Sequence, residues 1–246
     1  MLVDVFLYNG ESDMAALRLA ALGPHVDLQV AVVCDLTHQS DPNPLPEPLD
    51  CAQVCIPAVP IPEGRGGQGS RYYQWIERQH RNGARAVVDL FDLGASDVVM
   101  VSDVDEIPDP VTLDQLDQPG PVAVPMRMHG FALNYLYPTG WVGTTASRAC
   151  DMAPQAHRDW RYHLPHKGAG WHLSWFGDIA EKERKLRSFS HAELQGLDVE
   201  ACWREARHAN GEPLTHLTRD ETAGLDWPPP LFDDFTIPPS WWAPEG

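Results

Sequence analysis

Two aspartates separated by one residue are the strongest chemical signal in this sequence. Asp103 and Asp105 stand in the segment VVMVSDVDEIPDP, directly after a run of apolar and β-branched residues, and Glu106 follows them. Ligands of open α/β sheets bind beyond the carboxyl ends of the strands. In an extended segment, residues i and i+2 project from one side, so both carboxylates would reach one point. Two like charges at one point need a cation between them.

A divalent metal ion is the cation that best fits this arrangement. Mg²⁺ and Mn²⁺ prefer oxygen ligands and keep coordination positions open for substrate phosphates. A metal held by Asp103 and Asp105 would bridge to a diphosphate leaving group and neutralise its charge as the bond breaks. Pro108 and Pro110 interrupt regular structure after the acids, so we expect the acids to lie on a loop. Paired acids alone are common in solvated loops, and the preceding strand is what favours a metal site.

The first half of the chain predicts the sheet that would position these acids. Apolar residues at 3–8, 26–33 and 97–101 predict strands, and apolar spacing of three and four predicts a helix at 11–22. A second helix is expected at 70–90, with Ser70 as its N-cap after a glycine-rich loop. This alternation favours an α/β fold with a mainly parallel open sheet and helices on both faces.

The second half of the chain predicts shorter elements. Strands are expected at 122–128 and 131–137, short strands and loops through 167–178, a basic helix at 179–189 and a polar helix near 199–208. Seven prolines make 41–62 an irregular connection, and the proline- and tryptophan-rich tail 226–246 is expected to wrap the body without regular structure. No composition break divides the chain, so 1–246 is predicted to form a single domain.

Composition narrows the possible partners and compartment. The net charge is −17, which argues against nucleic acid as the main partner. The apolar runs are too short to span a bilayer, and the N-terminus resembles a core strand, so we expect no membrane span. The five scattered cysteines suit reduced thiols and a cytoplasmic protein. An acidic protein that binds an anionic substrate needs a metal or a local basic patch.

Three sequence blocks together resemble glycosyltransferase family 17, which includes an enzyme that adds N-acetylglucosamine (GlcNAc) to the β-linked mannose of glycoproteins. The blocks are VSDVDEIPDP (101–110), GWHLSWFGD (170–178) and KLRSFSHAE (185–193), in that order. Weaker matches are Glu11, Asp13, Arg18, Leu19, Gln79, Arg81, Trp141, Gly143, Pro229 and Pro230. The similarity touches most of the chain, and the three central blocks make it specific.

The resemblance implies a GT-A-like fold, a nucleotide-sugar donor such as UDP-GlcNAc, Mn²⁺ or Mg²⁺, and inversion at the anomeric carbon. A hydroxyl of a glycan or another carbohydrate conjugate would be the acceptor. Asp103 and Asp105 would hold the metal diphosphate, with His191 or His172 as a further ligand or phosphate contact. The matched residues Glu11 and Arg81 would belong to the donor site.

An inverting transfer needs a general base near the acceptor hydroxyl. Glu106, His172 and Glu193 are the candidates, and the sequence does not choose among them. Glu106 could instead cap its loop, and His172 lies among apolar neighbours that also suit a hydrogen-bonded core histidine. Trp171 could stack on a sugar face or pack in the core.

Two other classes of protein remain open on sequence grounds. A metal-dependent phosphohydrolase or nucleotidyltransferase also uses paired acids at a strand end, but it needs further acids for which no second cluster is evident. A non-catalytic carbohydrate-binding protein could use the tryptophans without the aspartate pair. Replacement of Asp105 by Asn would separate a transferase from a sugar-binding module.

Overall fold

A computed structural model describes residues 1–44, 46–63, 74–188, 194, 196–218, 221 and 235–243. The strands are β1 (Leu2–Tyr8), β2 (Leu28–Cys34), β3 (Ala52–Ile56), β4 (Val98–Asp103), β5 (Glu106–Pro108), β6 (Val122–Gly130), β7 (Tyr135–Leu136), β8 (Trp141–Arg148), β9 (Gly170–Ser174) and β10 (Thr215–His216). The helices are α1 (Ser12–Leu22), α2 (Trp75–Gly83), α3 (Ala86–Leu90), α4 (Pro154–Trp160), α5 (Ile179–Ser188) and α6 (Val199–Arg204). Short 3₁₀ helices are η1 (Gly23–His25), η2 (Pro110–Leu116), η3 (Ala149–Asp151) and η5 (Pro239–Trp241).

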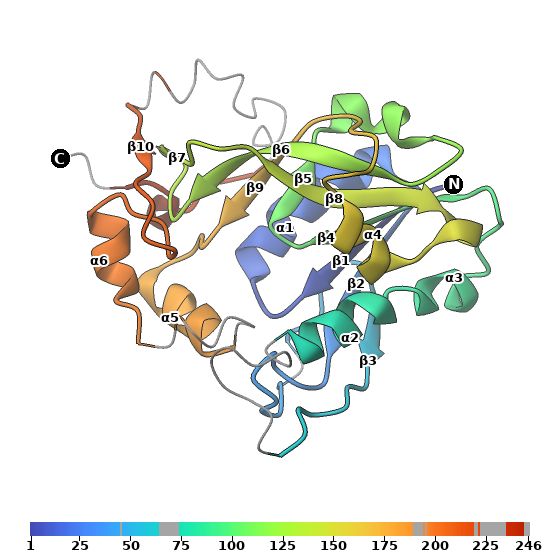
Figure 1. The fold of residues 1–246 in the computed structure, drawn as a ribbon, viewed down its shortest axis with the longest axis horizontal. Coiled ribbons are helices and arrows are strands. Elements are labelled where there is room, and N and C mark those ends of the chain that lie inside the picture. The colour runs from blue at the N-terminus through green and yellow to red at the C-terminus, as the bar shows by residue number, and fades with distance from the viewer. Residues whose placement is uncertain are drawn as a thin grey trace.

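One mixed sheet, with ten strands in the described residues, forms the centre of an α/β fold (Figure 1). Its parallel part has the order β4-β1-β2-β3, and the expected strands β1, β2 and β4 are all confirmed. These strands are continuous apolar runs because helices cover both of their faces. The register pairs Leu7 with Asp103, so the acidic segment begins beside the carboxyl end of β1.

The other half of the sheet is largely antiparallel, so the expectation of a mainly parallel sheet is wrong there. β8 pairs antiparallel with β4 and with β6, and β7 and β10 continue in the same manner. β9 runs parallel to β6 and carries the short antiparallel strand β5. Neighbouring strands joined by short connections reverse direction, as β6 and β7 do across residues 131–134. The sheet is therefore partly parallel.

Helices on both faces of the parallel strands are confirmed. Met14, Leu17 and Leu22 of α1 pack in one core cluster with the inward residues of β1, β2 and β4. Val87 and Val88 of α3 pack in a second cluster on the opposite face of the same strands. The alternation of side chains along each strand divides them between the two clusters.

Several elements differ from the sequence expectations. β3 lies inside the proline-rich stretch 41–62, and β8 and α4 lie where the sequence patterns predicted nothing regular. Of 131–137 only Tyr135–Leu136 is a strand. The helix expected at 70–90 is two helices, α2 and α3, and its start with Ser70 lies outside the described residues. α2 ends at Gly83, where a Cβ would lie 2.6 Å from Ile56 of β3.

The described part of the C-terminal tail packs against the body. Trp241 is almost fully buried, stacks edge-on against Phe176, and accepts a hydrogen bond on its carbonyl from Leu133 N. Residues 226–234 and 244–246 of the expected tail lie outside the described residues. Within the described chain, no helix is both long and apolar enough to cross a bilayer.

Candidate active site

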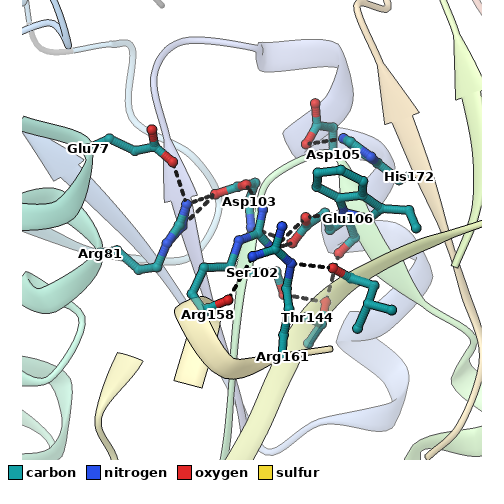
Figure 2. Close-up of polar contacts among 12 residues, drawn as sticks. Glu77, Arg81, Ser102, Asp103, Asp105, Glu106, Thr144, Arg158, Arg161 and His172 are labelled. Atoms are coloured by element: carbon teal, nitrogen blue, oxygen red, sulfur yellow. Dashed lines mark hydrogen bonds and ion pairs between the residues drawn. The ribbon is translucent and has the colours of Figure 1, made fainter. Parts of the chain in front are cut away.

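The acidic segment makes a turn at the end of β4. Asp103 is the last residue of β4, Val104 and Asp105 form the turn, and Glu106 begins β5. The expected loop is therefore confirmed at Val104 and Asp105, whereas Asp103 still belongs to β4 and Glu106 already to β5, so the two aspartates do not share one extended segment. The turn directs the two aspartates to different partners, as Figure 2 shows: Asp103 faces Arg81 and Arg158, while Asp105 lies beside His172.

Asp103 is held by two guanidinium groups. Arg81 of α2 donates from both Nη atoms to Oδ1 at 3.0 Å, and Arg158 of α4 donates to Oδ2 at 2.8 Å. Arg81 is itself buried and also contacts Glu77 at 3.0 Å. Burial alone would raise the pKa of Asp103, but Arg81 and Arg158 outweigh it and lower the pKa. Asp103 is thus ionised and firmly oriented.

Asp105 has one flexible cation and one imidazole beside it. Lys185 Nζ of α5 lies 2.9 Å from Oδ2, and His172 Nε2 of β9 lies 3.6 Å from Oδ1. Burial opposes ionisation, but Lys185 and His172 lower the pKa of Asp105 far below its ordinary value. The same contact, against burial, raises the pKa of Lys185. The pair is therefore ionised on both sides.

Glu106 is fully enclosed by hydrogen-bond donors. Its carboxylate accepts from Arg158 Nη1 at 2.7 and 2.9 Å, from Trp141 Nε1 at 2.8 Å and from the Asp103 amide at 3.2 Å. The side chain has no exposed surface. Gly143 leaves room for it, since a Cβ there would lie 2.8 Å from the Glu106 carboxyl carbon. These contacts make Glu106 an anchor of the acidic turn.

A buried arginine supports the turn from beneath. Arg18 of α1 is fully buried and forms an ion pair with Asp4 of β1 at 2.6 Å. Its guanidinium also donates to the Glu106 carbonyl at 2.6 Å and to Ser102 Oγ at 2.9 Å. The Asp103 carbonyl accepts a longer bond from the same group at 3.3 Å. Arg18 therefore connects the helix, the strand end and the backbone of the acidic turn.

The two aspartates border one cavity of about 620 Å³. Its lining includes Leu7 and Asn9 at the carboxyl end of β1, so it lies where an open sheet binds its ligands. The acids among the described lining residues are Glu11, Glu77, Asp103, Asp105 and Asp159. The lysine and arginines among them are Arg78, Arg158, Arg161 and Lys185. Acids outnumber these cations by one among the described lining residues, a much smaller acidic excess than in the whole chain.

Arg161 is the lining cation whose charge has no carboxylate partner among the described residues. Its Nε and Nη1 donate to the carbonyls of Val142 and Arg158 at 2.8 and 2.7 Å, and the guanidinium lies over the rings of Trp141 and Tyr162. Burial and the neighbouring Arg158 lower its pKa. A guanidinium held by neutral groups beside a cavity suits an anionic ligand.

The structure brings together some of the residues predicted from the sequence and not others. Glu11, Asp103, Asp105 and His172 all line the cavity. Arg81 does not line the cavity itself but contacts two acids that do, Asp103 and Glu77. Trp171 points to the opposite side of β9 from His172, into the core, because neighbouring strand residues alternate. His191 and Glu193 lie outside the described residues.

Arg158, like Arg161, is a site residue that the sequence analysis missed. It contacts both Asp103 and Glu106, yet it lies on a helix, α4, of only two turns. The one local signal is Pro154 at the first helical position, a common helix start. Trp141 was noted only as a weak family match, although its indole donates to Glu106 and its ring lies 4.8 Å from that of His172.

The site fits in part the divalent ion that the resemblance implies. Among the described residues no three His, Cys, Asp or Glu side chains surround a common point. The chemistry is nevertheless suitable, because Asp103 and Asp105 present carboxylate oxygens to a cavity with room for phosphates and water. Among the described residues, the contact to Asp105 Oδ1 is that of His172 Nε2 at 3.6 Å, which is longer than an ordinary hydrogen bond. Asp105 therefore fits an ion better than the doubly paired Asp103.

Comparison with known families places the chain in one of them. The sequence model of glycosyltransferase family 17 matches residues 1–200. The chain therefore belongs to glycosyltransferase family 17 and is a glycosyltransferase, as the three sequence blocks predicted. The match includes the acidic turn and the strand of His172 and ends before Pro229 and Pro230. No curated protein matches the chain significantly.

Proposed function

We propose that this chain is a metal-dependent, inverting transferase with a GT-A-like fold. It moves GlcNAc from UDP-GlcNAc to a hydroxyl of a glycan or related acceptor. Family membership supports sugar transfer. The observation that carries the finer proposal is that both aspartates of the acidic turn border one cavity with Arg161, at the carboxyl end of the parallel strands. That arrangement suits a nucleotide diphosphate bound through a cation.

Asp105, with Asp103 beside it, holds the divalent ion in this proposal. When bound, the ion neutralises charge on the departing diphosphate. Arg81 and Arg158 keep Asp103 oriented, and Glu106 and Arg18 keep the turn itself in place. The protein thus contributes a carboxylate position that is set before the donor arrives, which is how preorganised sites avoid reorganisation during the reaction.

Arg161 provides the second contact to the donor phosphates. Its charge is balanced by carbonyl oxygens and aromatic faces, so an incoming phosphate meets a guanidinium that no carboxylate of the described residues occupies. Planar guanidinium groups bind phosphate oxygens in pairs. Trp175 also lines the cavity, where it stacks on Phe131 with the ring centroids 5.8 Å apart.

His172 is our first candidate for the general base. Of the two described candidates, His172 borders the cavity, whereas Glu106 is enclosed by Arg158 and Trp141. A general base has to come within hydrogen-bond reach of the acceptor hydroxyl. Glu193 stays a candidate from the sequence alone. A His172→Gln variant that keeps donor binding but loses most of kcat would support the assignment.

The experiment that tests the proposal is release of UDP from UDP-GlcNAc with an acceptor mixture or with water. We expect release in the presence of Mn²⁺, its loss on chelation, and a loss of about 100-fold or more in Asp105→Asn, in line with removal of a charge-stabilising group. Arg187→Gln serves as a control on the exposed face of α5. Release that is unaffected by chelation and by Asp105→Asn would contradict the proposal.

A further inference from the structure

The two aspartates of the acidic turn are neutralised in different ways. Asp103 contacts two arginines, whose planar groups are held by further contacts to Glu77 and Glu106. Asp105 contacts a single ammonium, that of Lys185, at 2.9 Å. A guanidinium fork binds a carboxylate rigidly, whereas an ammonium sits on a flexible four-carbon chain. The cation on Asp105 is therefore the one that can be exchanged.

The helix that carries Lys185 is held in place by the preceding residue. Arg184 donates to the carbonyls of Asn9 and Gly10 at 2.9 and 3.0 Å, which ties α5 to the end of β1. Lys185 thus has a fixed Cα and a mobile end. Its side chain keeps 17% of its surface exposed and lines the same cavity as Arg161. From there the ammonium can leave Asp105 without leaving the site.

Asp105 needs a cation whether or not a ligand is bound. Its side chain is 8% exposed, and a buried carboxylate without a counter-charge is strongly unfavourable. A divalent ion on Asp105 would place two cations against each other if the Lys185 ammonium stayed where it is. An incoming diphosphate removes this conflict, because it offers the ammonium a new anionic partner.

We propose that Lys185 takes the place of the divalent ion on Asp105 in the donor-free protein. When metal and nucleotide bind, the ammonium moves from Asp105 to the donor diphosphate, and the ion takes over the carboxylate. This inference rests on the proposed function and extends it to the order of binding. Metal alone has to compete with Lys185, whereas metal together with a diphosphate does not. Metal and nucleotide therefore bind with positive coupling, which is reciprocal.

The test measures Mn²⁺ affinity directly, by titration calorimetry and by the electron paramagnetic resonance signal of unbound Mn²⁺, with and without UDP. In Lys185→Met we expect Mn²⁺ to bind the UDP-free protein about tenfold more tightly, and UDP with Mn²⁺ about tenfold more weakly, within the usual range of coupling factors. Arg187→Gln, an exposed change on the same helix, should alter neither affinity. Lys185→Arg keeps the charge and should leave UDP-free Mn²⁺ binding as weak as in the wild type.

The two changes in affinity expected for Lys185→Met have opposite signs, which separates the proposed role of Lys185 from a structural one. If Lys185 only stabilised the acidic turn, its loss would weaken both affinities, and that result would overturn the inference. Unchanged Mn²⁺ affinity in a folded Lys185→Met protein would also overturn it. If Lys185→Met does not fold, the wild type and Lys185→Arg still test the inference. Tight binding of Mn²⁺ by either protein in the absence of UDP would overturn it. A wild-type protein that binds neither Mn²⁺ nor UDP with Mn²⁺ would instead refute the proposed function itself.

Discussion

Arg158 offers the sharpest test of how the acidic turn is held. Its guanidinium contacts Glu106 Oε1 at 2.7 Å and Asp103 Oδ2 at 2.8 Å, and its own side chain is 12% exposed. Burial alone would lower the pKa of Arg158, but Glu106 and Asp103 raise it above its usual value. We therefore consider Arg158→Met, which keeps much of the side-chain volume and removes the charge.

The expected loss of stability follows from the two carboxylates, of Asp103 and Glu106, that Arg158→Met leaves without this arginine. Breaking a buried ion pair by removal of one partner destabilises by about 3–5 kcal/mol, because the remaining charge has no compensation. Asp103 keeps Arg81, and Glu106 keeps Trp141 and an amide, so we expect the lower end, about 3 kcal/mol. For a chain of this size such a loss lowers the melting temperature by roughly 6–12 °C.

Denaturant unfolding followed by circular dichroism measures this loss. The matched control is Arg78→Met, which breaks an equally close pair with Asp159 whose side chains are 46% and 41% exposed. Exposed pairs contribute about 0–1 kcal/mol, so the control should lose no more than that. The double variant Arg158→Met with Glu106→Gln should recover stability relative to Arg158→Met. Equal losses in Arg158→Met and Arg78→Met, or no recovery in the double variant, would refute the reasoning.

Three further predictions concern packing, ligand binding and pH. In Gly143→Ala the new Cβ would lie 2.6 Å from Met126 Sδ and 2.8 Å from the Glu106 carboxyl carbon. We therefore expect thermal unfolding to show a loss of about 1–3 kcal/mol in the free energy of unfolding. Gly120→Ala is the control without a comparable loss, because a Cβ there meets nothing within 4 Å. Arg161→Met should weaken binding of UDP by about tenfold or more and leave binding of uridine unchanged, since only UDP carries phosphates. Titration calorimetry measures both affinities, and equal weakening of both would argue against the phosphate contact. Burial lowers the pKa of Lys182 from 10.5 to about 8, so the unfolded state binds more protons between these values and this group makes stability rise with pH there. Lys182→Met should flatten that rise in unfolding curves measured across the range, and an unchanged slope would count against the buried lysine as its source.

The parallel part of the sheet could be predicted because its signals are local. β1, β2 and β4 are continuous apolar runs, and α1 shows apolar spacing of three and four, so each element can be recognised from its own residues. β3 could not be predicted because prolines surround it in the sequence. β8 could not be predicted because it contains polar residues such as Thr144, which are buried only because Ser102 and the Glu106 carbonyl lie opposite. Tertiary partners of this kind leave no trace in a local pattern.

The features of the site also divide into those that the sequence could predict and those that it could not. The aspartate pair at a strand end could be found from the sequence, and so could the place of His172 in a shared block. The direction of the two carboxylates could not, because it depends on a turn at Val104 and on cations from three distant elements, α2, α4 and α5. Arg158 lies 55 residues from Asp103 in the chain, on a short helix, and only the folded structure brings them together.

The most direct test of the central claim is anomalous diffraction at the manganese edge, on crystals that contain Mn²⁺ and UDP. We expect a manganese peak in coordination contact with the Asp105 carboxylate and with the diphosphate, in the cavity that Asp103 and Arg161 also line. A bound nucleotide with no manganese at Asp105, or manganese held elsewhere in the cavity, would contradict it.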